Sequence, residues 1–240
     1  MSNFTFDLHT HTIASGHAST ATITDLAKAA RKVGLQAIGI SDHGPATVGG
    51  ATESYFRNLA YAPKKVLGIT ILHGAEVNIL DQQGSLDLAD TILEKLDFVI
   101  ASMHRPVKKP GTLAENTQAY INAMKNPHVN IIGHPDDAHY PVDYLALVKA
   151  AVEHNVLLEV NNGSLEANGY RGDAKTNDLL ILNLCKHFYH PVILSSDSHG
   201  TEHVGDFTEA LELVELADMP RELVLNHSLE RLYTFLSLRK

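Results

Sequence analysis

The sequence contains no tryptophan and only one cysteine, Cys185, among its 240 residues. A single cysteine excludes an internal disulfide and a metal site built from several thiolates, so any bound metal needs other ligands. Long apolar runs are also lacking: no stretch approaches the roughly 20 consecutive apolar residues of a transmembrane helix, and Met1–Leu8 has neither the basic start nor the apolar run of a secretion signal. These absences predict a soluble, cytoplasmic protein without a membrane partner.

Positive charge is also scarce. The 19 Lys and Arg residues stand against 28 Asp and Glu residues, which gives a formal net charge of −9. Long nucleic acids and anionic lipids are polyanions, so this balance disfavours both as partners. Histidine, in contrast, is abundant: the chain has 15, and imidazole is the side chain that most often binds metal.

Short apolar runs bounded by Gly, Asp or Asn recur along the chain and predict seven β-strands. Successive runs begin 26 to 36 residues apart, and this interval is typical of parallel βα units. Seven units favour a barrel over an open sheet. We therefore expect an α/β fold, a distorted seven-stranded parallel (βα)7 barrel formed by one domain over residues 1–240. The predicted strands are Phe4–Leu8, Ala37–Ser41, Ile69–Gly74, Phe98–Ser102, Asn130–Gly133, Val156–Val160 and Val192–Ser195.

Segments with helical hydrophobic spacing lie between most of these strands. The first has Thr22 and Asp25 as capping residues at its start and Gly34 at its end. The long connections Gly44–Tyr61 and Asn161–Asn177 are expected to carry function. The predicted helices are 23–33, Leu88–Leu96, Ala114–Met124, Val142–His154, Thr176–Cys185, Phe207–Leu216 and Leu229–Leu238.

Metal-binding residue types follow almost every predicted strand, and in a parallel barrel these points meet at the C-terminal ends of the strands, where active sites form. His9 and His11 are two residues apart on a strand, so both side chains point to the same side. One such pair is weak evidence, but His, Glu and Asp recur at nearly all strand ends, and buried imidazoles and carboxylates need partners. The candidate ligands are His9, His11, His17, His43, Glu76, His104, His134, Asp197 and His199.

Nine ligands are too many for one ion, which takes about four to six, so two or three ions are expected. Imidazole nitrogen with carboxylate oxygen and no thiolate suits Zn²⁺, Mn²⁺ or iron. Asp7, two residues before His9, is a candidate acceptor for an N–H of a ligating imidazole, with a buried structural carboxylate as the alternative.

Four motifs together resemble those of the polymerase-and-histidinol-phosphatase (PHP) family of metal-dependent phosphoesterases, and most of all its small stand-alone branch with three zinc ions on a distorted seven-stranded barrel. The resemblance extends from Phe4 to about Leu236. The motifs are Asp7-Leu8-His9-Thr10-His11, Ser41-Asp42-His43-Gly44-Pro45, Gly133-His134-Pro135 and Ser196-Asp197-Ser198-His199.

The resemblance implies a ligand assignment for three divalent ions, zinc first, with manganese or iron as alternatives. His9, His11, Glu76 and Asp197 would surround one ion. Glu76 would bridge to a second ion bound by His104 and His134, and His17, His43 and His199 would bind the third.

Such a centre predicts a phosphatase. Two ions about 3.5–4 Å apart can share a hydroxide that attacks the phosphorus of a small phosphate monoester, while their charge stabilises the phosphoryl oxygens. The predicted catalytic residues are Glu76, Asp197 and Arg171, the last as a cation that binds phosphate oxygens; a surface arginine is the alternative for Arg171.

Other functions stay open from the sequence. An amidohydrolase-like barrel hydrolase also begins with HxH, but many such enzymes bridge their metals with a carboxylated lysine at a strand end, and no predicted strand end carries lysine. A non-catalytic metal-loaded sensor would not need all nine ligands. A nuclease or proofreading module is disfavoured by the negative charge. The substrate and the oligomeric state, a homo-oligomer included, are not determined.

Overall fold

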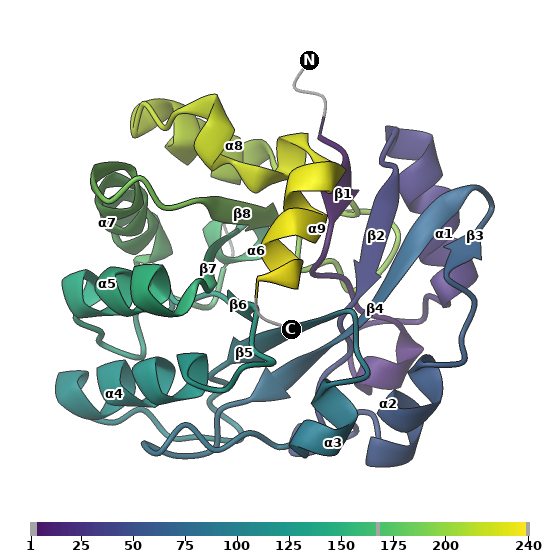
Figure 1. Ribbon diagram of the computed structural model, residues 1–240, viewed down its shortest axis with the longest axis horizontal. Coiled ribbons are helices and arrows are strands. Elements are labelled where there is room, and N and C mark those ends of the chain that lie inside the picture. Colours follow the sequence, from purple (N-terminus) through teal and green to yellow (C-terminus); the bar gives the residue numbers. More distant parts are fainter. Residues whose placement is uncertain (1–3, 167–168, 239–240) are drawn as a thin grey trace.

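The centre of the fold is a sheet of seven parallel strands that curls into a nearly closed barrel (Figure 1). The computed structural model describes residues 4–166 and 169–238. The two sheet edges meet just beyond the strands, where Thr10 and Ser198 form a parallel bridge and the His11 amide donates to the Ser198 carbonyl at 2.8 Å. The predicted (βα)7 barrel is confirmed. In sheet order the strands are β1 (Phe6–Asp7), β2 (Ala37–Ile40), β4 (Ile69–Asn78), β5 (Phe98–Ser102), β6 (Ile131–Ile132), β7 (Leu157–Asn161) and β8 (Val192–Ser195), and β3 (Lys65–Val66) pairs antiparallel with β4.

Helices connect successive strands and cover the outside of the barrel (Figure 1). The first shows how its sequence sets the boundaries: Thr22 and Asp25 form a capping box, and Gly34 ends the helix with a φ of 86°, which suits glycine. Within the described ranges no helix is long and apolar enough to cross a membrane. The helices are α1 (Ile23–Val33), α2 (Glu53–Leu59), α3 (Asp90–Leu93), α4 (Leu113–Met124), α5 (Tyr144–His154), α6 (Asn162–Leu165), α7 (Ala174–His187), α8 (Thr208–Leu216) and α9 (Leu229–Ser237), with 3₁₀ turns at Ile13–Ser15, Arg221–Leu223 and Leu225–His227.

Some predicted boundaries are wrong. β4 continues past Gly74 because its pairing with β5 extends to Asn78, so Glu76 lies inside the strand and does not follow it. The long connection after β2 contains α2, which the sequence pattern did not predict. Ala167 and Asn168, in the long connection after β7, lie outside the described residues.

Alternate residues of each strand point into the barrel, and this inner face changes from apolar to polar along the strand. On β4 the inner face runs from Leu72 to Glu76, and on β7 from Leu157 to Glu159. α9 crosses the front of the barrel in Figure 1 and packs on the apolar part. The barrel therefore has a closed apolar end and a polar end. The apolar cluster comprises Phe6, Leu8, Ala37, Leu72, Phe98, Ile100, Ile131, Leu157, Ile193, Leu225, Leu232, Phe235 and Leu236.

Candidate metal centre

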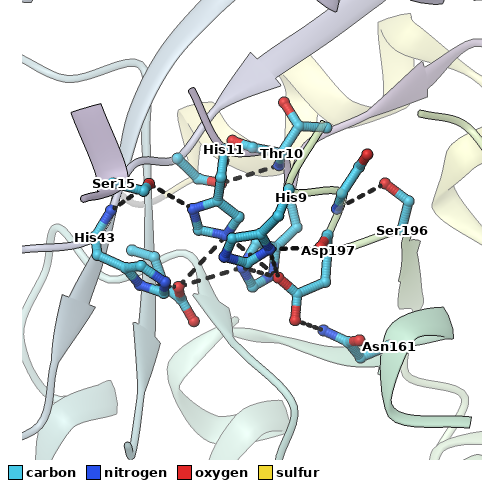
Figure 2. A network of polar contacts seen from close by, with 12 residues as sticks. His9, Thr10, His11, Ser15, His43, Asn161, Ser196 and Asp197 are labelled. Carbon is cyan, nitrogen blue, oxygen red and sulfur yellow. Dashed lines mark hydrogen bonds and ion pairs between the residues drawn. The ribbon is translucent and has the colours of Figure 1, made fainter. Parts of the chain in front are cut away.

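His9 and His11 follow β1 directly and are held in place by the residue between them. The Thr10 hydroxyl donates to the Gly39 carbonyl at 2.7 Å, and the Thr10 amide donates to the Ser41 hydroxyl at 3.1 Å. Both imidazoles are fully buried, with ring centroids 5.0 Å apart (Figure 2). Anchoring of Thr10 to the next strand thus brings two imidazoles side by side at the polar end of the barrel.

The Glu76 carboxylate lies among five of the predicted histidine ligands and is fully buried. Its Oε1 is 2.9 Å from His134 Nε2 and 3.2 Å from His104 Nε2. Its Oε2 is 2.6 Å from His43 Nδ1, 3.4 Å from His9 Nε2 and 3.7 Å from His11 Nε2. The two oxygens face different histidines, which is the arrangement that a bridging carboxylate requires.

Asp197 and His199, from the loop after β8, close the other side of the cluster. Asp197 Oδ1 is 3.2 Å from His11 Nε2 and 3.5 Å from His9 Nε2. The His199 ring stacks on His11 with centroids 4.1 Å apart, and the His17 ring is 5.0 Å from His199. The structure therefore brings all nine predicted ligands together.

Three sets of three ligand atoms lie within 4.8 Å of one another. The set of His9, His11 and Glu76 coincides with part of the first predicted ion site. The other two sets differ from the predicted grouping because His43 lies with Glu76 and His104, and His11 lies with His43 and His199. Among the described residues, three of the nine predicted ligands belong to no set: His17, His134 and Asp197.

Unpartnered buried atoms test whether metal ions fit this cluster. Buried polar atoms in proteins normally have a hydrogen-bond partner. Five buried atoms of residues in the three sets, all in the described part of the chain, make no hydrogen bond, although His43 Nδ1 and Glu76 Oε2 lie 2.6 Å apart. These atoms are His9 Nε2, His11 Nε2, His43 Nδ1, His199 Nε2 and Glu76 Oε2. A divalent cation would satisfy them, and imidazole nitrogen with carboxylate oxygen is a donor set that suits zinc, manganese or iron. The residues fit a metal centre.

The cluster is also electrostatically coupled. Burial lowers the pKa of His9, but the surrounding carboxylates, Glu159 foremost, outweigh burial and raise it well above its ordinary value. For His11, burial and two neighbouring imidazoles lower the pKa well below its ordinary value. Burial raises the pKa of Glu76, but the imidazoles around it, His104 foremost, outweigh burial and lower it well below the usual range. Glu76 is therefore held as a carboxylate, the form that binds metal.

Comparison with known proteins gives the family. The PHP domain profile matches residues 7–169. The chain belongs to the PHP domain family. Two relatives described as "probable phosphatase" are each 43% identical to it: one from Clostridium novyi over 97% of this chain and 94% of the relative, and one from Thermoanaerobacter sp. over 98% and 95%. The histidinol phosphate phosphatase of Lactococcus lactis, complexed with zinc, L-histidinol and phosphate, has a TM-score of 0.64 at 18% identity and covers 90% of this chain and 94% of its own. This PHP domain protein is a phosphatase.

Glu159 of this PHP domain protein contacts two of the predicted ligands, and the sequence analysis gave it no role. Its Oε1 is 2.7 Å from His9 Nδ1, and its Oε2 accepts a hydrogen bond from the His134 amide at 2.7 Å. A carboxylate at Nδ1 holds the imidazole proton there and leaves Nε2 for a metal. The available signal was a charged residue inside a strand that is otherwise apolar, Leu157–Val160.

Asp7 does not take this role. Its carboxylate accepts from the Ser196 hydroxyl at 2.6 Å and from the Gly205 amide at 2.9 Å, so it ties β1 to the chain after β8. Burial raises the pKa of Asp7 to about 6, and its hydrogen bonds offset only part of that effect. The structural alternative holds for Asp7 because its partners are the β8 loop and not an imidazole ring nitrogen.

Arg171 of this protein is not a surface arginine: only 4% of it is exposed. It donates to Asp197 Oδ2 at 2.9 Å, to the Ser164 hydroxyl at 2.8 Å and to Asn161 Oδ1 at 3.2 Å. Its guanidinium thus contacts Asp197 Oδ2, whereas His11 faces Oδ1 of the same carboxylate. Arg171 also lines the cavity in front of the cluster.

That cavity has a volume of about 610 Å³. Six of the predicted ligands line it: His17, His43, His104, His134, Asp197 and His199. The size is within the range of small-molecule sites. The other lining residues are Thr47, Met103, Arg105, Pro106, Val107, Asp137, Tyr170 and Arg171.

Proposed function

We propose that this PHP domain protein is a metal-dependent phosphatase that hydrolyses a small phosphate monoester and binds three divalent ions, zinc first, with manganese or iron as alternatives. The proposal is carried by the buried, unpartnered imidazole and carboxylate atoms around Glu76. Two of the three ligand sets share Glu76, so ions bound in them would be neighbours. Zinc in the Lactococcus phosphatase of similar fold supports zinc as the first choice.

When bound, the ions would supply a hydroxide nucleophile near neutral pH and positive charge opposite the phosphoryl oxygens. The chain orients its ligands for this task. Asp197 Oδ2 accepts from Arg171 at 2.9 Å and from Asn161 at 3.2 Å, which turns Oδ1 toward the histidines. Attack by this hydroxide would be direct on phosphorus, so no side chain would be phosphorylated.

Arg171 is proposed to bind the phosphate. Its guanidinium is buried, lines the cavity and lies beside Asp197, so a phosphoryl group in front of the cluster meets a positive charge there. Arg105, which lines the same cavity, adds a second cation. Substrate size follows from the cavity: about 610 Å³ suits a compact organic group and not a long polymer.

The experiment that tests the proposal measures metal and turnover together. Protein purified without chelator or added metal is analysed by mass spectrometry for metal content, then assayed on p-nitrophenyl phosphate, a long oligonucleotide, and a panel of esters and amides. We expect close to three ions per chain and turnover of the phosphomonoester alone. One ion or fewer, or faster cleavage of an amide or an oligonucleotide, would refute it, and so would a phosphoenzyme trapped by rapid quenching.

A cytoplasmic location and the exclusion of long nucleic acids remain predictions that rest on composition and the net charge of −9. A homo-oligomer likewise remains an open alternative, to be tested by sedimentation of the metal-loaded protein.

A further inference from the structure

The hydrogen bonds of His11 continue away from the metal centre to helix α2. The Ser15 hydroxyl is 2.8 Å from His11 Nδ1 and donates to Asp42 Oδ1 at 2.7 Å. Asp42 Oδ2 accepts from the Tyr55 phenol at 2.5 Å. Ser15 lies between the imidazole of His11 and the backbone of His43 in Figure 2. His11, Ser15 and Asp42 are fully buried, so solvent does not compete for these contacts.

Asp42 acts only as an acceptor in this arrangement. Besides Ser15 and Tyr55, the Thr12 amide donates to Oδ1 at 2.7 Å and the Thr12 hydroxyl donates to Oδ2 at 2.8 Å. Each carboxylate oxygen therefore receives two donors. The single proton of the Ser15 hydroxyl must point to Asp42, since two acceptor oxygens 2.7 Å apart would otherwise repel each other.

The direction of the bond between Ser15 and His11 follows. The Ser15 oxygen has given its proton to Asp42 and also accepts from the His43 amide at 3.2 Å. It is left only as an acceptor toward His11, so the imidazole proton must sit on Nδ1. A neutral imidazole with its proton on Nδ1 has a free lone pair on Nε2. That atom faces Asp197 Oδ1 at 3.2 Å, and because this oxygen attracts a proton to Nε2, the bond to Ser15 has to outweigh it until a cation binds.

His11 needs such a relay more than His9 and His104 do. Nδ1 of His9 faces the carboxylate oxygen Glu159 Oε1, and Nδ1 of His104 faces the amide oxygen Asn78 Oδ1. Both oxygens can only accept a hydrogen bond. A hydroxyl can both donate and accept, so Ser15 alone would permit the wrong tautomer. His11 also belongs to two of the three ligand sets, so its tautomer affects more than one ion.

We propose that Tyr55, Asp42 and Ser15 form a relay that holds the His11 proton on Nδ1 and keeps Nε2 free for metal, which makes Ser15 and Tyr55 positioning residues of the metal centre. The inference rests on the proposed function, because it concerns the same ions. It also gives the connection Gly44–Tyr61 a role, since α2 brings Tyr55 to Asp42.

The test compares Tyr55→Phe and Ser15→Ala with matched controls. Tyr55→Phe removes one hydroxyl, and Tyr61→Phe makes the same change at a tyrosine of the same connection that is 87% exposed. Ser54→Ala, at an exposed serine of α2, is the control for Ser15→Ala. In metal-free protein with ¹⁵N-labelled histidine, long-range ¹H–¹⁵N spectra report the His11 tautomer, with His11→Gln to assign the signal. Competition with a chelator then measures zinc affinity.

We expect His11 in the Nδ1–H form in the wild type and both controls, and a measurable Nε2–H fraction in the two relay variants. Zinc affinity should fall about 10- to 100-fold in Ser15→Ala, as for other partners of metal ligands, and less in Tyr55→Phe. A wild-type Nε2–H tautomer overturns the relay. So does a loss of zinc affinity with an unchanged tautomer, because that outcome shows Tyr55 and Ser15 to be merely structural.

Failure of the two proposals can be told apart. A wild type that binds no zinc refutes the proposed function, whereas the tautomer measured in metal-free protein still decides the relay. Circular dichroism checks that each variant folds. If Ser15→Ala does not fold, Tyr55→Phe carries the test, because it removes one oxygen and keeps the ring.

Discussion

Replacement of Glu76 by glutamine is the sharpest test of the metal centre, because it keeps the size of the side chain and removes its charge. Glu76 is fully buried, and its oxygens lie between 2.6 and 3.7 Å from five imidazole nitrogens, so solvent does not screen it. At an effective dielectric constant of about 20, two unit charges ~3 Å apart interact by roughly 5 kcal/mol, and a divalent ion doubles this. Desolvation offsets much of the gain, which leaves about 3 kcal/mol per ion, or ~10²-fold in affinity.

Two ions should weaken together in Glu76→Gln, since Glu76 belongs to two ligand sets. We expect loss of more than one metal equivalent by mass spectrometry and loss of nearly all turnover of p-nitrophenyl phosphate. His199 belongs to one set, so His199→Gln should lose chiefly one ion. Glu53→Gln, at an exposed ion pair with Arg57, is the control for the charge change. Thermal unfolding should show that all variants fold, because the apolar cluster under α9 does not involve these side chains.

The reasoning is refuted if Glu76→Gln keeps its full metal complement or wild-type turnover, since Glu76 then bridges no ions. Equal metal loss in Glu76→Gln and His199→Gln would contradict the division of ligands into sets that share Glu76.

Three further predictions concern residues around the centre. Glu159→Gln should weaken zinc binding about 10- to 100-fold in chelator competition, because an amide can present its NH₂ to His9 and no longer fixes the proton on Nδ1. Unchanged zinc affinity would contradict the role of Glu159 in orienting His9. Arg171→Lys keeps a positive charge but loses the planar guanidinium that reaches Asp197 and faces the cavity. KM for p-nitrophenyl phosphate should therefore rise about 10-fold. An unchanged KM would exclude phosphate binding by Arg171. Burial lowers the pKa of His190, so the unfolded chain takes up a proton at this residue before the folded chain does as pH falls below about 6.5. The free energy of unfolding, measured by urea titration, should therefore drop between pH 7 and pH 5. The drop should be smaller in His190→Asn.

The local elements were predictable because they depend on neighbours in sequence. The capping residues Thr22 and Asp25 and the terminal Gly34 set α1, and β5 and β8 have the predicted bounds. The strand that contains Glu76 was predicted too short, because Gly74 was taken as its end. Pairing with β5 extends it to Asn78, and in this part apolar Ala75 and Val77 alternate with polar Glu76 and Asn78. α2 was missed because its seven residues carry only two buried apolar side chains, Phe56 and Leu59.

The sequence by itself determined the barrel, the nine candidate ligands and the family resemblance, since strand spacing, the recurrence of His, Glu and Asp after strands, and the motifs are all written along the chain. Only the tertiary structure decided which ligands share a space, that Glu159 holds His9, that Arg171 is buried on Asp197, and that Ser15 links His11 to Asp42. The physical reason is range: helix caps and strand patterns act between residues a few positions apart. Metal ligation and hydrogen bonding act within a few ångströms, between residues such as His9 and Glu159 that are 150 positions apart in the chain.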